Sequence, residues 1–374
     1  MDKRTFLKTL GLGTAAVASG MGGTLLTGCC ASGRKEESDT TSANDGFVKN
    51  WVWMRIDQSI SDTDYINRFK ALRANGISGV MFEQDSERHF TMAKECGLEA
   101  HRWKWTMNRG DEYIMKNHPE WYAKNRKGES SWDKPAYVQY YRFACPNNED
   151  FVKYLIEDYA KEAEKQYIDG IHLDYVRYPD VILPVGLWKN YGIQQTQELP
   201  EYDYCYCETC RKKFKDLKGV DPMDLQFPME SQSWINFRLD AITNVVDQIT
   251  ERIHGMGKPI SAAVFPGPSM AKRMVRQDWG NWNLDAYFPM IYNGFYNEDV
   301  DWIGTSTRES VKTLNGRGKV YSGVFFPDIK AKFAEACGHA FNAGASGIAF
   351  FDGPDDKHLG LFSEFLAKND LKVK

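Results

Sequence analysis

From Trp51 to the C-terminus, short apolar runs alternate with longer runs in which apolar residues recur every third or fourth position. The short runs are typical of buried strands and the longer ones of amphipathic helices. The apolar runs predict eight strands, at residues 51–56, 79–83, 99–105, 170–175, 260–265, 286–292, 320–326 and 347–351. Helices are predicted between them, including 64–75, 148–166, 234–256 and 330–343.

Eight strand–helix units in succession predict an α/β fold of the (β/α)8 TIM-barrel type, with residues 48–374 as one domain. Glycines that should stop a helix precede four of the strands, at Gly76, Gly97, Gly257 and Gly344. A doubly wound open sheet is the alternative, but no Gly-rich phosphate loop follows the first strand.

Two connections are longer than a barrel needs. Residues 107–147 follow the third strand, and residues 179–233 follow the fourth. Both are rich in aromatic residues, and long loops of this kind usually serve function. Because loops that follow barrel strands lie at the C-terminal face, we expect these two to wall a cleft there.

The segment 169–179, Asp-Gly-Ile-His-Leu-Asp-Tyr-Val-Arg-Tyr-Pro, has the strongest signal for chemistry. Its alternation predicts a strand with Asp174 near the C-terminal end, where catalytic groups of barrel enzymes lie. Tyr175 and Arg177 follow at once, an aromatic and basic exit that a buried strand does not require. We interpret Asp174 as the leading catalytic carboxylate, tuned by Arg177. The alternative is that Asp174 only forms a salt bridge with Arg177 and shapes a loop.

Glycoside hydrolysis usually requires a second carboxyl group. Glu83 and Asp352 stand at the ends of the second and last predicted strands, and Glu298 is a looser candidate. Acids at strand ends also cap helices and pair with arginine, so the sequence leaves the partner of Asp174 open.

Further polar and aromatic residues are predicted to bind substrate. His101, Trp103 and Trp105 share one face of the third strand, and Tyr292 and Asn293 end the sixth. The alternative is that the two tryptophans fill the barrel core and His101 is a buried, hydrogen-bonded residue. The chain contains 11 Trp, 19 Tyr and 21 Phe, and flat apolar rings of this kind stack on sugars.

Three closely spaced thiols lie in the second long connection, at Cys205, Cys207 and Cys210, and Cys145 is a plausible fourth. Four thiolates in a tetrahedral array form a closed structural zinc site. A disulfide with one thiol left over is the alternative, since exported proteins favour disulfides. No organic cofactor is expected.

The N-terminal residues have the features of an export signal. Residues 1–28 are basic and then apolar, and they end in Leu-Thr-Gly before Cys29, which resembles a lipoprotein cleavage box with Cys29 as the lipidated residue. Lys3-Arg4 resembles a twin-arginine signal with Lys for the first Arg, so the ordinary secretory route stays open. An uncleaved membrane anchor is the other alternative. Residues 29–47 are then a flexible tether, which predicts an exported, lipid-anchored protein of the cell envelope.

Together these residues resemble the bacterial glycosyl hydrolase-like family 10, from about Trp51 to Phe365. The most specific matches are His118-Pro-Glu-Trp121, Cys145-Pro-Asn-Asn148 and residues 167–179; weaker ones are Gln277-Asp-Trp279 and residues 288–292. The resemblance implies a glycosidase barrel, and members with assigned activity include outer-membrane lipoproteins that cut peptidoglycan strands stripped of peptide. Residues 169–174 also resemble the strand of family 18 chitinases, but Val176 stands where those enzymes have a Glu. The cysteines are similar to the zinc cluster of family 42 β-galactosidases, which supports the metal interpretation.

We therefore predict a glycoside hydrolase acting on a polysaccharide or cell-wall glycan, in contact with a membrane only through its lipid. The alternative from a different class is a surface glycan-binding lipoprotein that has the barrel but no turnover. A metal-dependent deacetylase or esterase is weaker, because no His-Asp metal triad and no Gly-x-Ser-x-Gly motif appears. The formal net charge of −4 argues against a nucleic-acid partner.

Overall fold

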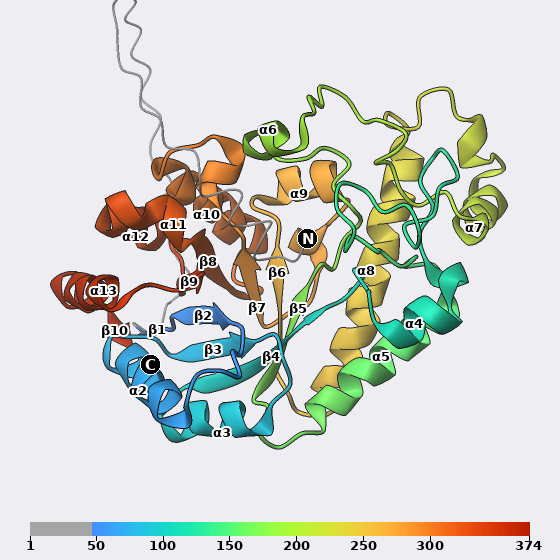
Figure 1. The fold of residues 1–374 in the computed structure, drawn as a ribbon. Helices are drawn as coiled ribbons and strands as arrows, with labels where there is room; N and C mark the ends of the chain where they lie inside the picture. Colours follow the sequence, from blue (N-terminus) through green and yellow to red (C-terminus); the bar gives the residue numbers. More distant parts are fainter. Residues whose placement is uncertain (1–46) are drawn as a thin grey trace, which may run out of the picture.

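A computed structural model describes residues 47–374. Eight parallel strands form a closed barrel in the order β2 to β9, and helices surround it (Figure 1). The predicted (β/α)8 fold is confirmed. The predicted export signal, Cys29 and all of the predicted tether except Phe47 lie outside the described residues.

All eight predicted strands are present. They are β2 (Trp51–Met54), β3 (Gly79–Phe82), β4 (Glu99–Trp105), β5 (Gly170–Asp174), β6 (Ile260–Val264), β7 (Ala286–Pro289), β8 (Lys319–Phe325) and β9 (Gly347–Phe351). The sixth predicted strand extends to residue 292, whereas β7 ends at Pro289, which has no N–H to continue a ladder.

Each strand is followed, directly or after shorter helices, by a helix that covers the outside of the barrel. These are α2 (Asp62–Ala74), α3 (Glu87–Glu95), α5 (Glu149–Ala163), α8 (Gln232–His254), α9 (Pro268–Val275), α10 (Asp301–Leu314), α12 (Phe333–Asn342) and α13 (Asp356–Lys368). Side-chain caps fix where several of them begin: Asn148 accepts the N–H of Phe151 at the start of α5, and Asp355 accepts that of His358 at the start of α13. The four predicted helix-stop glycines all have positive φ, as a left-handed helix end requires.

Alternation along the strands separates two apolar cores. Residues that point inward form a small cluster inside the barrel, and those that point outward pack under the helices. The inner cluster is made of Trp51, Trp53, Met81, Trp103, Ala263, Phe288, Tyr321 and Ala349. Three tryptophans belong to this cluster, and bulky inward side chains of this kind form the packed core of a TIM barrel.

The two long connections form one wall beyond the C-terminal ends of β4 and β5 (Figure 1). The first carries α4 (Glu112–Asn117) and η1 (Pro119–Trp121). The second carries η2 (Val185–Leu187), α6 (Trp188–Tyr191), α7 (Glu208–Lys218) and η3 (Pro222–Asp224). Their backbones pair through an antiparallel bridge between Asn125 and Tyr204, and the Tyr206 N–H donates to the Lys124 carbonyl at 2.7 Å.

A second, two-stranded sheet joins the two ends of the described chain. In it β1 (Phe47–Val48) pairs in parallel with β10 (Lys372–Val373), and the Lys374 N–H donates to the Val48 carbonyl at 3.0 Å. The segment that leads into the first barrel strand therefore lies beside the segment that follows the last helix, α13. Among residues 47–374, no helix has the length and apolar character needed to cross a membrane.

Candidate active site

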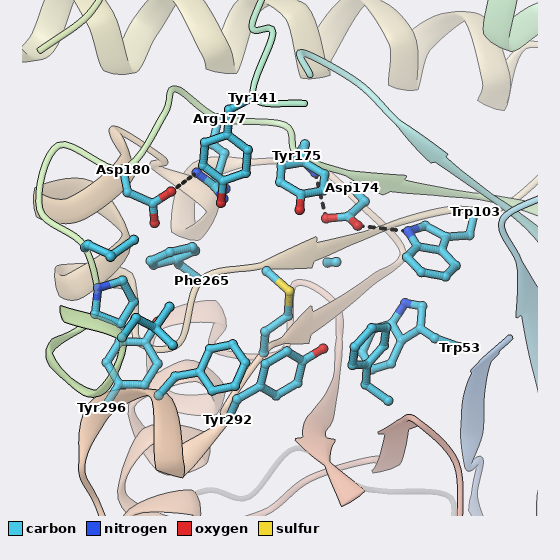
Figure 2. Close-up of a pocket in the computed structure, with 17 residues that line it drawn as sticks. Trp53, Trp103, Tyr141, Asp174, Tyr175, Arg177, Asp180, Phe265, Tyr292 and Tyr296 are labelled. Atoms are coloured by element: carbon cyan, nitrogen blue, oxygen red, sulfur yellow. Dashed lines mark hydrogen bonds and ion pairs between the residues drawn. The ribbon is translucent and has the colours of Figure 1, made fainter. Parts of the chain in front are cut away.

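A pocket opens at the C-terminal face of the barrel, between the strand ends and the wall formed by the long connections (Figure 2). Most of the side chains that line it are aromatic or aliphatic, and its charged residues are Asp174, Arg177 and Asp180. The remaining lining residues are Trp53, Trp103, Tyr141, Tyr175, Leu183, Pro184, Leu187, Ala263, Phe265, Met290, Tyr292, Phe295, Tyr296 and Phe351. An apolar concavity with few convergent polar groups is the usual form of a small-molecule site.

Asp174 is the last residue of β5 and its carboxylate is held at both oxygens. Oδ2 accepts the indole N–H of Trp103 at 3.0 Å, and Oδ1 accepts the backbone N–H of Tyr175 at 2.7 Å. Figure 2 shows the carboxylate between these two donors, at the edge of the pocket. Asp174 is only 6% exposed. A carboxylate fixed in orientation at a barrel-strand tip is what nucleophilic or base chemistry needs.

The backbone turns sharply directly after Asp174. Tyr175 has a φ of 49°, in the left-handed region that costs a tyrosine about 1 kcal/mol or more. This conformation ends the strand and accompanies the hydrogen bond from the Tyr175 N–H to the preceding carboxylate. Backbone strain of this kind tends to lie at functional sites.

Arg177 belongs to a buried ion pair within the pocket wall. Its guanidinium donates to Asp180 at 3.0 Å and to the Tyr178 carbonyl at 2.9 Å, and it lies over the rings of Tyr141, Phe143, Tyr175 and Phe265. Burial alone would lower the pKa of Arg177, but the Asp180 carboxylate raises it above its usual value. The ion pair of Arg177 in the structure is therefore with Asp180, three residues further along.

Two tyrosines that line the pocket feel the charge of the Asp174 carboxylate. Burial and the charge of Asp174 hold the pKa of Tyr292 well above its usual value. Burial, Tyr140, Tyr141 and Asp174 do the same to the pKa of Tyr175. Both phenols therefore remain protonated at neutral pH and can donate hydrogen bonds.

The family follows from a match along most of the barrel. A family model described as "Glycosyl hydrolase-like 10" matches residues 87–336, which is more than half of the chain. The chain belongs to the glycosyl hydrolase-like 10 family. This confirms the resemblance, and the matched region includes Asp174 and all four clustered cysteines. A search of curated protein sequences finds no significant match.

Solved structures of glycosidases share the fold of this family member. The glycoside hydrolase domain of PgaB (BpsB) from Bordetella bronchiseptica is 11% identical with a TM-score of 0.60, over 88% of this chain and 99% of that one. The catalytic domain of β-amylase from Paenibacillus polymyxa is 14% identical with a TM-score of 0.57, over 88% and 99%. The β-galactosidase of Marinomonas ef1 is 10% identical with a TM-score of 0.60, over 87% of this chain and 61% of that one. At these identities the similarity shows the barrel fold.

Of the predicted site residues, the structure brings five to the pocket: Asp174, Trp103, Tyr175, Arg177 and Tyr292. His101 lies lower in the barrel, because β4 places it opposite Gly170 while Trp103 lies opposite His172. Its ring packs 4.8 Å from that of Trp51, and burial lowers its pKa to about 4. His101 therefore occupies the barrel interior, outside the pocket lining.

The other predicted residues also lie outside the lining. Glu83 forms an ion pair with Arg55, and Asp352 is exposed on a turn with a φ of 59° just after Phe351. Trp105 packs behind Tyr175, with ring centroids 4.8 Å apart. The Asn293 side chain donates to the Glu298 carbonyl at 3.0 Å and so closes the turn after Tyr292. None of these four lines the pocket, and the carboxylate that shares it with Asp174 is Asp180.

Sequence reasoning missed several lining residues. Trp53, Phe265 and Phe351 sit in apolar strand segments whose inward and outward faces are both buried, so no polar alternation marks the inner face. Asp180 follows Pro179 in the predicted long connection, and its spacing of three residues from Arg177 is the one signal that could have indicated it.

The four cysteines come together as one buried cluster that joins the long connections. The sulfur atoms of Cys145, Cys205, Cys207 and Cys210 all lie within 4.8 Å of one another, and Cys145 is 3.4 Å from Cys210 and 3.5 Å from Cys207. A disulfide would bring two sulfurs to about 2.05 Å, whereas tetrahedral zinc separates them by roughly 3.8 Å. The amide of Asn147 donates to the Cys210 sulfur at 3.3 Å. The four residues can therefore bind a metal ion, and their all-thiolate set suits a soft one.

Proposed function

We propose that this family member is a glycoside hydrolase that cuts a polysaccharide or cell-wall glycan, with Asp174 as its catalytic carboxylate. The observation that carries the proposal is the position of Asp174: the end of a barrel strand, both oxygens oriented, within an aromatic-lined pocket. Family membership and the glycosidase barrels that share the fold support the class of reaction.

The aromatic lining supports a sugar as the ligand. Trp53 and Trp103 lie together near Asp174 (Figure 2). Phe351 packs against both tryptophans and stacks on Tyr292, with ring centroids 5.7 Å apart. Rings of this kind present flat surfaces to the C–H faces of pyranoses, while the phenols donate to sugar hydroxyls. Asp174 would then lie beside the scissile bond, as the nucleophile or as the base that activates water.

The pocket contains one other carboxyl group that could take part in the proposed reaction, that of Asp180. Asp180 forms a buried ion pair with Arg177, so it suits electrostatic stabilisation of a positively charged transition state better than proton donation. Because the Asp180 carboxylate is paired with Arg177, the residues that the structure describes offer no clear carboxylic proton donor beside Asp174, which favours the second candidate function, a glycan-binding protein without turnover. The two functions differ in whether products form.

We also propose zinc at the four cysteines and attachment of the protein to the cell envelope through a lipid on Cys29. The zinc proposal rests on the all-cysteine ligand set and its separations. The lipid proposal rests on the small residues before Cys29 in the sequence. When bound, the metal would supply a structural cross-link, because four protein ligands leave no open position for catalysis.

The experiment that tests the function is product analysis on a panel of glycans. The protein is incubated with peptide-free peptidoglycan strands, chitin oligosaccharides and plant polysaccharides, and products are identified by mass spectrometry. Shortened glycans that disappear with the Asp174→Asn variant support hydrolysis. Binding of a glycan without any product favours the non-catalytic candidate. The proposal would be refuted if the protein neither bound nor cleaved any glycan of the panel.

A further inference from the structure

His172 lies inside the barrel with no exposed surface and is not among the pocket residues. It stands two residues before Asp174 on β5 and points to the same, inner face. A polar side chain buried in the apolar interior costs free energy unless it is hydrogen-bonded, so its partners indicate its role.

Both imidazole nitrogens of His172 have partners, and the partners fix its tautomer. Nε2 is 2.9 Å from the indole nitrogen of Trp53, which can only donate, so Nε2 must accept. Nδ1 is 2.9 Å from the Ser261 hydroxyl and therefore carries the proton and donates it. The Ser261 hydroxyl lies 3.4 Å from the Ile171 carbonyl, which can only accept. The donors thus run in one direction from Trp53 to the backbone of β5.

The residue at the start of this chain of hydrogen bonds belongs to the pocket. Trp53 lines it, on the same side as Trp103 (Figure 2). Its ring also packs edge-on against Phe288 at 5.8 Å and Phe351 at 6.3 Å. Two alternate residues of β5 therefore each accept one indole N–H from the pocket: His172 from Trp53, and Asp174 from Trp103.

We propose that His172 is a positioning residue that fixes the indole of Trp53 as a sugar-stacking surface beside Asp174. The proposal rests on the proposed glycosidase function for the identity of the ligand, but not for the geometry. A stacking ring contributes to substrate and transition state alike, so its loss should raise KM and leave kcat nearly unchanged.

The test compares His172→Phe with His172→Gln. Phe keeps a flat ring but leaves the Trp53 N–H without an acceptor, whereas the Gln side-chain oxygen can reach the position of Nε2 and accept from it. With peptide-free peptidoglycan strands we expect KM to rise about tenfold for His172→Phe, the loss of one hydrogen bond, and to return to within about threefold for His172→Gln. A merely structural role would lower stability without this split between KM and kcat.

A second readout does not depend on activity. This readout is the NMR signal of the Trp53 indole N–H, which is assigned by its loss in Trp53→Phe. The signal should shift and exchange faster with solvent in His172→Phe and recover in His172→Gln. If His172→Phe does not fold, His172→Leu replaces it, because Leu also leaves the Trp53 N–H without an acceptor.

The outcomes separate the two proposals. An unchanged Trp53 signal in His172→Phe, or in His172→Leu where that variant replaces it, would overturn the positioning role whatever the activity. A changed signal with an unchanged KM would show that Trp53 is held but does not bind the glycan, which also overturns the inference. If the parent protein cleaves no glycan, the proposed function fails, while the indole signal still decides whether His172 positions Trp53.

Discussion

The indole N–H of Trp103 donates to Oδ2 of Asp174 at 3.0 Å, from the neighbouring strand of the barrel. Trp103 thus both walls the pocket and orients the carboxylate. Together with the Tyr175 N–H at the other oxygen, it fixes the plane of the Asp174 carboxyl group. A group that must approach an anomeric carbon gains from such fixation, because reactivity depends on orientation.

Replacing Trp103 by Phe should lower turnover while the fold is kept. The ring remains but the N–H is lost, and a hydrogen bond to a charged group is worth about 1.5–3 kcal/mol, so we expect kcat to fall roughly tenfold to a hundredfold. The matched control is Trp132→Phe, which removes an indole N–H that donates to the Met115 carbonyl outside the pocket. Equal rates for both variants would show that the Trp103 hydrogen bond does not serve the reaction.

Metal analysis should find one ion per chain, bound by the four cysteines. Because these cysteines join the two connections that wall the pocket, Cys145→Ser or a strong chelator should lower the melting temperature by several degrees. Cys96→Ser is the control, since the Cys96 thiol is half-buried against the Ile66 carbonyl, outside the cluster. If no metal were found and the number of titratable thiols were two below the number of cysteines in the protein, the cluster would instead contain a disulfide.

Breaking the Arg177–Asp180 pair should destabilise the protein strongly. Arg177→Met leaves a buried carboxylate without its cation, which typically costs about 3–5 kcal/mol in denaturant unfolding. Adding Asp180→Leu to this variant should recover part of the loss, because no charge then remains unpaired. For comparison, Lys212→Met breaks the exposed pair with Asp216 and should cost less than about 1 kcal/mol.

The carboxyl group of Asp328 should make stability depend on pH. Burial raises its pKa to about 6, although the Gly294 N–H lowers it in part. The folded state therefore holds this proton more tightly than the unfolded chain, and stability is lost as pH rises from about 4 to 6. Asp328→Asn cannot ionise, so its stability relative to the parent should be higher at pH 7 than at pH 4.

The expected difference for Asp328→Asn is up to about 3 kcal/mol, measured by urea unfolding at both pH values. Asp240→Asn, on the exposed face of α8, is the control. A relative stability of Asp328→Asn that is the same at both pH values would contradict the raised pKa.

How far the sequence predicts this molecule depends on the kind of signal. The barrel follows from hydrophobic periodicity, and all eight strands lie where it places them. Periodicity also put Asp174 at a strand end. Periodicity does not show, however, how deep inside the barrel a residue lies. His101 and Trp103 share one face of β4, yet only Trp103 reaches the pocket.

Side-chain pairing is the part that the sequence does not encode locally. Glu83 lies at the C-terminal end of its strand as predicted, but Arg55 on the adjacent connection pairs with it. Trp53 was missed because its strand is apolar on both faces, so nothing in the pattern distinguishes a pocket residue from a core residue. Only the closed barrel brings Trp53, His172 and Ser261 together from three different strands.

The central claim is that Asp174 performs the chemistry, and the turnover of Asp174→Asn tests it most directly. The measurement uses a glycan cleaved by the parent protein, with binding of the same glycan recorded alongside and the melting temperature used to show that the variant is folded in the assay. We predict a fall in kcat of roughly a thousandfold or more, with glycan binding nearly unchanged and a lower melting temperature. The Asn side chain can accept from only one of the two N–H groups that Asp174 accepts from, and it cannot act as nucleophile or base. Turnover within about threefold of the parent would contradict the assignment of Asp174.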